Sequence, residues 1–317
     1  MPGLAAAALA GACVAGTEPP VPASIEVSPP SATLPWFDET VQLTATVLDT
    51  AGRTLPGVTV AWTSEDALVA TVDATGLVTA VAAGVTFVRA GTGSVEGSAT
   101  VTVAPDRRAL LILYDALGGS GWLESENWGT DAPLDEWHGV AADSKDNVLA
   151  LELSNNGLSG TIPPEIGALG ALQELQLGSW LDALTGEIPP GIGNLDNLRY
   201  LHLWGFDLTG AIPPEIGNLQ NLRYLHLWGG DLTGAIPPEI GNLQNLRYLH
   251  LWGGDLTDAI PPELGNLQNL RYLDLSGDLT GAIPPELGSL RNLQGLYLYY
   301  NELTGAIPPE LGTHLPV

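Results

Sequence analysis

The chain has 317 residues, enough for two or three domains, and a formal net charge of -26 at pH 7. It contains only ten lysines and arginines, which excludes a nucleic-acid partner, because such a partner requires a basic surface that releases counterions. The 45% share of hydrophobic residues indicates folded domains rather than a disordered acidic chain. The single cysteine, Cys13, excludes an intrachain disulfide and a thiolate metal cluster.

Residues 1–13 are predicted to be a secretory signal peptide. The apolar run Leu4–Ala12 is too short to span a bilayer and ends in small residues, as cleaved signal peptides do. Ala10-Gly-Ala-Cys13 resembles the lipobox of bacterial lipoproteins, which implies that Cys13 carries a lipid and becomes the mature N-terminus. Ordinary cleavage at the same small residues is the alternative. Residues 14–23, with three prolines, are expected to form an extended tether.

Residues 24–104 contain seven short runs of alternating apolar and polar residues, separated by Gly, Pro, Asp and Ser. This pattern predicts an all-β sandwich with Trp62 in its core. The segment resembles the group 2 bacterial immunoglobulin-like domain, a module of bacterial surface proteins, in the runs Thr40–Val47, Val60–Ser64, Val69–Asp73, Gly76–Ala80 and Ala99–Val103. The resemblance implies a spacer or, less often, an adhesive domain, and the fold alone does not decide between them.

Residues 105–146 form a third region. Apolar residues at helical spacing predict a helix over Arg108–Leu117, which Gly118-Gly119 would end. Three tryptophans follow: Trp122, Trp128 and Trp137. The segment resembles the N-terminal cap of plant-type leucine-rich repeats, without the paired cysteines of the plant caps. Because a terminal unit must hide an apolar end from water, we expect these tryptophans to be structural.

Residues 147–317 contain seven units with a period of 24 residues in the middle, which begin near Asn147, Ala171, Asn197, Asn221, Asn245, Asn269 and Asn292. Units of this size are stable only when stacked, which predicts a solenoid. Their frame, Leu-Thr/Ser-Gly-x-Ile-Pro-Pro-Glu-Ile/Leu-Gly, resembles the plant-specific class of leucine-rich repeats. The resemblance implies a right-handed solenoid with a parallel β-sheet on its concave face. Short 3-10 or irregular turns, each begun by proline, would line the convex face.

The repeats depart from that class at one position. The class places an asparagine after each strand, and only Asn156 and Asn301 stand there, whereas the middle units carry Phe206, Gly230 and Gly254. The neighbouring aspartates can accept hydrogen bonds but cannot donate them: Asp207, Asp231, Asp255 and Asp278. We therefore expect a looser inner ladder in the centre of the solenoid.

Aromatic residues recur at the strand positions that alternate with inward leucines, and arginines form a column beside the tyrosines. Because side chains of a strand point alternately to its two faces, and neighbouring strands lie about 4.8 Å apart, these residues should form stacked columns. Such a patch favours ligand binding, and Tyr, Trp and Arg dominate binding surfaces. The alternative is that the rings only stabilise the sheet. We name this set the concave strip: Tyr200, His202, Trp204, Tyr224, His226, Trp228, Tyr248, His250, Trp252, Tyr272, Tyr297, Tyr299, Arg199, Arg223, Arg247 and Arg271.

Sequence patterns of catalysis and of metal binding are not found. His202, His226 and His250 would form a straight column rather than a tetrahedral metal site, and Asp143–Asn147 lacks the spacing of a calcium loop. No nucleophile elbow or phosphate-binding loop occurs. We predict no enzyme activity, no cofactor and no metal. Mutual repulsion should lower the pKa values of the three histidines, so that stability falls as pH drops from about 6.5 toward 5.

The sequence therefore predicts a non-enzymatic recognition or adhesion module. It would be secreted or anchored in the cell envelope, contact the membrane only through a lipid on Cys13, and bind a peptide, protein or glycan on the concave strip. The alternative is a structural envelope protein whose repeats form a rigid scaffold without a specific ligand. No polar cap follows the last repeat in Gly312–Val317, which indicates a truncated gene or a missing downstream domain.

Overall fold

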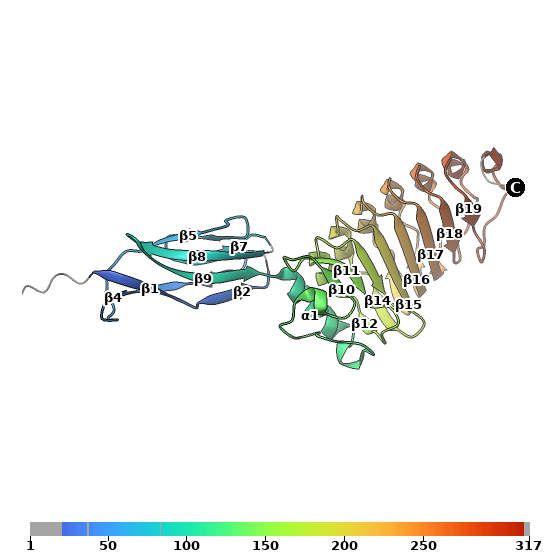
Figure 1. The fold of residues 1–317 in the computed structure, drawn as a ribbon. Coiled ribbons are helices and arrows are strands. Elements are labelled where there is room, and N and C mark those ends of the chain that lie inside the picture. The colour runs from blue at the N-terminus through green and yellow to red at the C-terminus, as the bar shows by residue number, and fades with distance from the viewer. Residues whose placement is uncertain (1–20, 37, 83, 314–317) are drawn as a thin grey trace, which may run out of the picture.

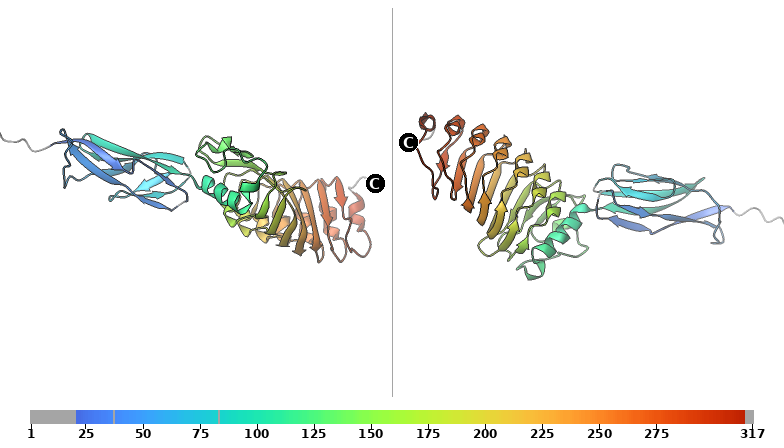
Figure 2. Two further views of the ribbon diagram at one scale, coloured as in Figure 1. Left: turned by 90° about the horizontal axis from the view of Figure 1, so that it is seen from below. Right: turned by 180° about the vertical axis from the view of Figure 1, so that it is seen from behind.

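The protein is described by a computed structural model that covers residues 21–36, 38–82 and 84–313. An N-terminal β-sandwich and a curved solenoid lie end to end, joined by a short helical region (Figures 1 and 2). Within these residues, no helix has both the length and the apolar character needed to cross a membrane.

The sandwich is built from nine strands where the alternation predicts seven. They are β1 (Pro22–Ser28), β2 (Ser31–Leu34), β3 (Thr40–Gln42), β4 (Thr44–Asp49), β5 (Ala61–Ser64), β6 (Ala70–Val72), β7 (Leu77–Ala80), β8 (Gly84–Thr92) and β9 (Val95–Val103). One predicted run divides into β3 and β4 at Leu43, and β2 lacks a clear alternation. The strands pair in the orders β2-β9-β8-β5, β3-β7-β6 and β1-β4, and Leu43, Val78 and Val101 are fully buried between them.

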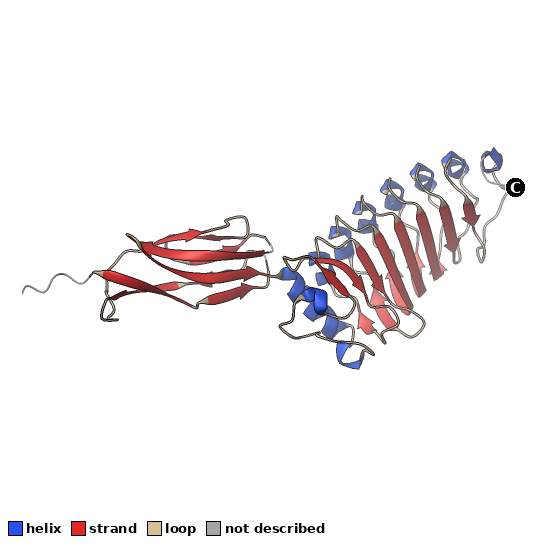
Figure 3. Ribbon diagram, viewed as in Figure 1, coloured by secondary structure: helices blue, strands red, loops and turns tan. Residues whose placement is uncertain are grey.

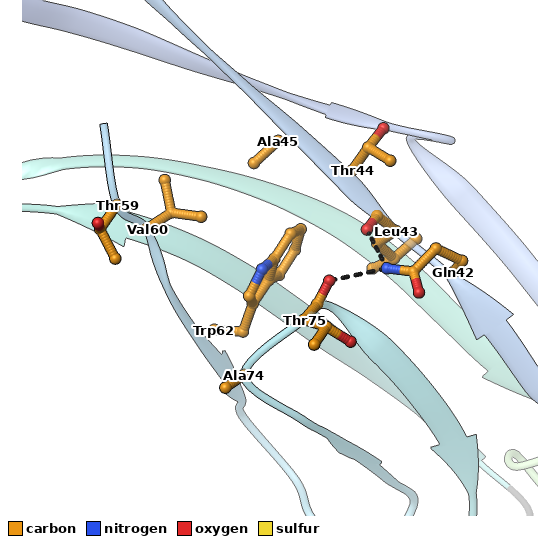
Figure 4. A pocket seen from close by; sticks show the side chains of 9 residues that line it. All are labelled: Gln42, Leu43, Thr44, Ala45, Thr59, Val60, Trp62, Ala74 and Thr75. Atoms are coloured by element: carbon orange, nitrogen blue, oxygen red, sulfur yellow. Dashed lines mark hydrogen bonds between the residues drawn. The ribbon is translucent and has the colours of Figure 1, made fainter. Parts of the chain in front are cut away.

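Trp62 differs from its predicted place in the core. Its indole is only partly buried and lines an open cleft of about 530 Å³ beside β5 (Figure 4). Across the cleft, the Gln42 side-chain amide donates to the carbonyls of Leu43 and Thr75, at 2.8 Å each. The β6–β7 turn passes close to the indole, since a Cβ at Gly76 would lie 2.8 Å from it.

The region between sandwich and solenoid contains α1 (Pro105–Ala116), two 3-10 turns (Gly119–Gly121 and Leu134–Glu136) and β10 (Val140–Ala142). Gly118 has a φ of 69° and ends the helix as its sequence predicts. Trp122, Trp128 and Trp137 are buried with ring centroids about 5 Å apart, and each indole N–H donates to a backbone carbonyl. These tryptophans therefore close the apolar end of the repeats.

The solenoid sheet is parallel and in register. Its strands are β11 (Val148–Glu152), β13 (Glu174–Leu177), β15 (Tyr200–Ala211), β16 (Tyr224–Gly234), β17 (Tyr248–Leu256), β18 (Tyr272–Ser276) and β19 (Gly295–Tyr297), with β10 antiparallel at the first edge. In a second row, β12 (Ser159–Thr161) pairs with β14 (Ala183–Glu187), and β14 pairs with the distal part of β15. Leucines and isoleucines of every unit form one continuous core.

The opposite side of the solenoid carries one 3-10 turn per unit (Figure 3). Each turn begins at the second proline of a Pro-Pro pair, where the missing N–H is tolerated. The turns are Pro164–Ala168, Pro190–Asn194, Pro214–Asn218, Pro238–Asn242, Pro262–Asn266, Pro285–Ser289 and Pro309–Thr313. The asparagine that opens five units donates to the carbonyl of the residue directly before the start of the preceding unit, at 2.7 to 2.8 Å, from Asn197, Asn221, Asn245, Asn269 and Asn292.

The expectation of a looser centre is wrong. The middle strands β15, β16 and β17 are the longest of the described solenoid, with 12, 11 and 9 residues, and pair through their distal halves. Glycine makes this possible, since a Cβ at Gly229 would lie 2.6 Å from the Leu232 side chain. The aspartates beside the missing asparagines are exposed and accept no hydrogen bond within the described chain. Backbone pairing replaces the asparagine ladder.

Candidate functional site

The register of β15 to β18 aligns the concave strip in columns. One column is Tyr200, Tyr224, Tyr248 and Tyr272, the second is His202, His226, His250 and Asp274, and the third is Trp204, Trp228, Trp252 and Ser276. Tyr200 and Tyr224 stack at 4.4 Å with an interplanar angle of 6°, and Trp228 and Trp252 at 4.6 Å with 12°. The side chains between these positions are buried leucines, so the rings form the outer layer of the sheet.

Of the three tyrosines of the last unit, the two that belong to the strip join different parts of it. The sixth unit is one residue short, so Gly295 stands opposite Tyr272, and Tyr297 stands opposite Asp274 in the histidine column. The Tyr299 hydroxyl donates to Asp274 Oδ2 at 3.0 Å. Tyr297 and Tyr299 are about half exposed, with 46% and 48% of their surface accessible.

The tryptophan column forms the wall of an apolar pocket of about 310 Å³. We name it the aromatic pocket, and its lining residues are Trp180, Trp204, His226, Trp228, His250, Trp252, Ser276, Tyr299 and Tyr300. Trp228 is only 6% exposed and belongs to its floor, whereas Trp252 is 39% and Trp180 66% exposed. Trp252 is therefore the exposed ring of the column.

Trp180 is a site residue that the repeat pattern does not reveal, because it lies in the insertion of the second unit. Its ring centroid lies 4.9 Å from those of both Trp204 and Trp228, and 5.5 Å from that of Phe206. Tyr300 and Ser276 are further lining residues that lie outside the predicted set. The only sequence signal for Trp180 is that a tryptophan stands in an insertion next to the units of the strip.

The insertion is held in place by the buried carboxylate of Asp182. This group accepts the backbone N–H groups of Leu158 at 2.7 Å and Asn155 at 3.0 Å, and the hydroxyl of Ser179 at 2.8 Å. Asp182 is 4% exposed. Because the carboxylate links the insertion to the preceding unit, it fixes the position from which Trp180 reaches the pocket.

Two histidines of the column, His202 and His226, have lowered pKa values. Burial lowers the pKa of His226 to about 3, and the charges of His250 and His202 contribute less. Burial likewise lowers the pKa of His202. For His202 and His226 the direction agrees with the sequence prediction, but burial rather than mutual repulsion is the larger cause. His250 differs from the other two because its Nδ1 lies 3.0 Å from Asp274 Oδ2.

Four buried polar atoms in or beside the pocket have no hydrogen-bond partner in the described chain: His202 Nε2, Trp204 Nε1, Asp274 Oδ1 and Ser276 Oγ. The four arginines of the strip are exposed and form no ion pair with any described residue. They stand five residues before the tryptophan column, which is about 16 Å along a strand. The strip therefore has a cationic edge at the start of the strands and an aromatic pocket toward their ends.

Two further sequence predictions concern a metal site and a lipid. In the part of the chain that the structure describes, no three side chains of the metal-ligating types converge, and Asp143 instead accepts hydrogen bonds from the backbone of Lys145 and Asn147 in a turn. Cys13, the predicted lipidation site, lies outside the described residues. The assignment of the concave strip to ligand binding stays a prediction.

Two family models match the chain. The bacterial Ig-like domain (group 2) matches residues 22–103. The leucine-rich repeat matches 147–169, 197–219, 221–243, 245–267 and 292–314. The two units outside these segments are the second, which carries the insertion, and the sixth, which is one residue short.

Solved structures of plant receptors resemble the solenoid part. PEPR1 in PEPR1-AtPEP1 is 30% identical over 66% of this chain and 30% of its own, with a TM-score of 0.60. Pollen Receptor Kinase 3 is 26% identical over 63% of this chain and 97% of its own, with a TM-score of 0.53. The ectodomain of GASSHO1/SCHENGEN3 from Arabidopsis thaliana is 34% identical over 65% of this chain and 28% of its own, with a TM-score of 0.47.

The match thus spans less than a third of the PEPR1 and GASSHO1 chains. The fold and the family models agree on both parts of the chain, and the repeat frame agrees with them for the solenoid. The chain consists of a group 2 bacterial immunoglobulin-like domain followed by a solenoid of leucine-rich repeats.

Proposed function

We propose that the solenoid is a non-catalytic recognition module that binds a peptide or protein ligand on its concave strip, and that the chain acts outside the cell. The observation that carries this proposal is the aromatic pocket. Its large rings remain exposed on one face of the sheet, whereas the leucines of the other face are buried in the core. Exposed aromatic patches beside arginines are typical of binding surfaces. The likeness to PEPR1, whose structure is of PEPR1-AtPEP1, supports a ligand on the same type of solenoid.

The sandwich fits the role of a spacer in this proposal. It lies at the end of the solenoid where the cap is, away from the strip (Figure 1). Trp36 packs against the core that the cap shares with the repeats, and the Ala104 N–H donates to the Leu34 carbonyl at 3.1 Å. A sandwich attached in this way would hold the strip at a distance from the N-terminal tether. The alternative is that the sandwich itself is adhesive.

The test is a screen of peptide and glycan arrays with the native chain and with Trp252→Ala. Trp252 suits the test because it is 39% exposed, whereas the truncation of Trp228, at 6%, would open a cavity in the sheet. Phe87→Ala is the matched control, because Phe87 is 45% exposed and lies in the sandwich. Binding that falls with Trp252→Ala and persists with Phe87→Ala supports the proposal. If no ligand depends on Trp252, the strip is structural and the envelope-scaffold interpretation takes its place.

A further inference from the structure

The aromatic pocket presents ring faces and edges from several directions. Trp180 meets both Trp204 and Trp228 edge to face at 4.9 Å, and Trp252 stacks on Trp228 from the other side. Tyr299 and Tyr300 complete the lining near β19. The face of an aromatic ring carries a negative potential, so a cation that enters this space is attracted by more than one ring.

A carboxylate adjoins the pocket. Asp274 Oδ2 lies 3.0 Å from both His250 Nδ1 and the Tyr299 hydroxyl, and these two side chains are part of the pocket lining. Asp274 Oδ1 is buried and has no partner, and no lysine or arginine of the described residues pairs with this carboxylate. A negative charge therefore lies behind the aromatic wall, and only a histidine and a hydroxyl compensate it.

The remaining lining offers few polar groups to a neutral polar ligand. It contains no asparagine, glutamine, arginine or lysine, and no carboxylate, so it lacks the planar polar groups that would read the hydroxyl pairs of a sugar. Burial keeps the His226 imidazole neutral, with a pKa of about 3, so that this ring does not repel a cation. The charge of the whole chain, -26, also favours a positive group.

We propose that the aromatic pocket binds the charged end of a lysine or arginine side chain of the ligand. This inference rests on the proposed function and specifies one contact of it. The exposed arginines at the start of the strands repel such a group and suit an acidic one, about 16 Å away. An extended peptide that runs along the strands covers this distance in about five residues. Because side chains of an extended peptide alternate between two sides, a basic residue four or six positions from an acidic residue is the sequence signature expected of the ligand.

The test compares each cation with its neutral isostere. The probes are N-acetyl-arginine amide against N-acetyl-citrulline amide, and choline against 3,3-dimethyl-1-butanol, titrated at pH 8 and 0.15 M salt while the indole N–H signals are followed by NMR. Arginine should bind at least about five-fold more tightly than citrulline, given the strength of desolvated cation–π contacts. Asp274→Asn keeps the hydrogen-bond acceptor and should remove most of that preference. Glu263→Gln, which removes a charge from an exposed convex turn, should leave it unchanged.

The outcomes separate this inference from the proposed function. Equal binding of arginine and citrulline, or no perturbation by either probe, overturns the assignment. Binding of choline without arginine replaces the basic side chain by a lipid-type headgroup and also overturns it. An array ligand that lacks a basic residue but depends on Trp252 leaves the proposed function standing while this inference fails. If no array ligand depends on Trp252, both fail.

Discussion

The buried carboxyl group of Asp106 predicts an unusual pH dependence of the cap. Asp106 lies in the first turn of α1, is 4% exposed, and accepts the backbone N–H of Val148 at 2.7 Å. Burial raises the pKa of Asp106 to about 6, and the negative charges of Asp143 and Asp146 act in the same direction. The substitution that tests this is Asp106→Asn, which is neutral at every pH and retains an oxygen for the Val148 N–H.

The sign follows from proton binding. An unfolded aspartate titrates near pH 3.9, so between about pH 4 and 6 the folded chain binds more protons than the unfolded chain, and stability falls as pH rises through this window. A difference of about two pH units corresponds to about 3 kcal/mol at pH 7. The attraction between a charged Asp106 and the helix N-terminus offsets up to about 1 kcal/mol of this. Asp106→Asn should therefore raise the free energy of unfolding at pH 7 by about 1–3 kcal/mol.

The assay is urea denaturation of both proteins from pH 4.5 to 8, read as the difference between them at each pH. Asp143→Asn is a control of opposite sign, because the hydrogen bond from the Asn147 side chain lowers the pKa of Asp143, so its ionised form stabilises the fold. That variant should lose stability at pH 7. If Asp106→Asn is less stable than the native chain at pH 7, or if their difference does not change with pH, the reasoning is refuted.

Three further predictions concern the solenoid and the N-terminus. Asp182→Ala leaves the buried N–H of Leu158 and the partly buried N–H of Asn155 without an acceptor, so it should lower the free energy of unfolding by about 2–4 kcal/mol in urea denaturation and release Trp180 from the pocket. An unchanged denaturation midpoint would contradict this. Because the pKa of His226 is lowered to about 3, its site binds more protons in the unfolded chain below pH 6.5, and the contribution of His226 to stability should fall by about 2 kcal/mol between pH 6.5 and 5, opposite in sign to that of Asp106. His226→Phe should flatten that fall, and an equal fall in the variant would count against it. Cys13→Ser should move the protein from the membrane fraction to the medium, and an unaltered distribution on immunoblots would exclude lipidation.

The columns of the strip were predictable from the sequence because the repeat length is constant in the middle units. Equal spacing in a parallel sheet brings equivalent residues opposite each other, and the pairing of Tyr200 with Tyr224 and of His226 with His250 follows this rule. The cap helix was also predictable from the sequence, because its apolar spacing and Gly118 are local signals. Local patterns and a strict period are thus enough for the architecture.

The pocket was not predictable, because it depends on contacts between units. Trp180 stands in an insertion whose path is set by the hydrogen bonds of Asp182 to the preceding unit, and no periodic pattern encodes such bonds. The partial exposure of Trp62 likewise follows from how the β6–β7 turn packs beside β5. The main cause of the histidine pKa shifts is the burial of each ring, and the sequence does not show how deeply each ring is buried.

The central claim is that the concave strip binds a ligand through its exposed rings. Isothermal titration calorimetry of the strongest array ligand, with the native chain, Trp252→Ala and Phe87→Ala, tests it directly. We predict that Trp252→Ala weakens binding at least about ten-fold, or about 1.4 kcal/mol, while its urea midpoint stays close to that of the native chain. Phe87→Ala should bind as the native chain does. Equal affinities of all three proteins would contradict the claim.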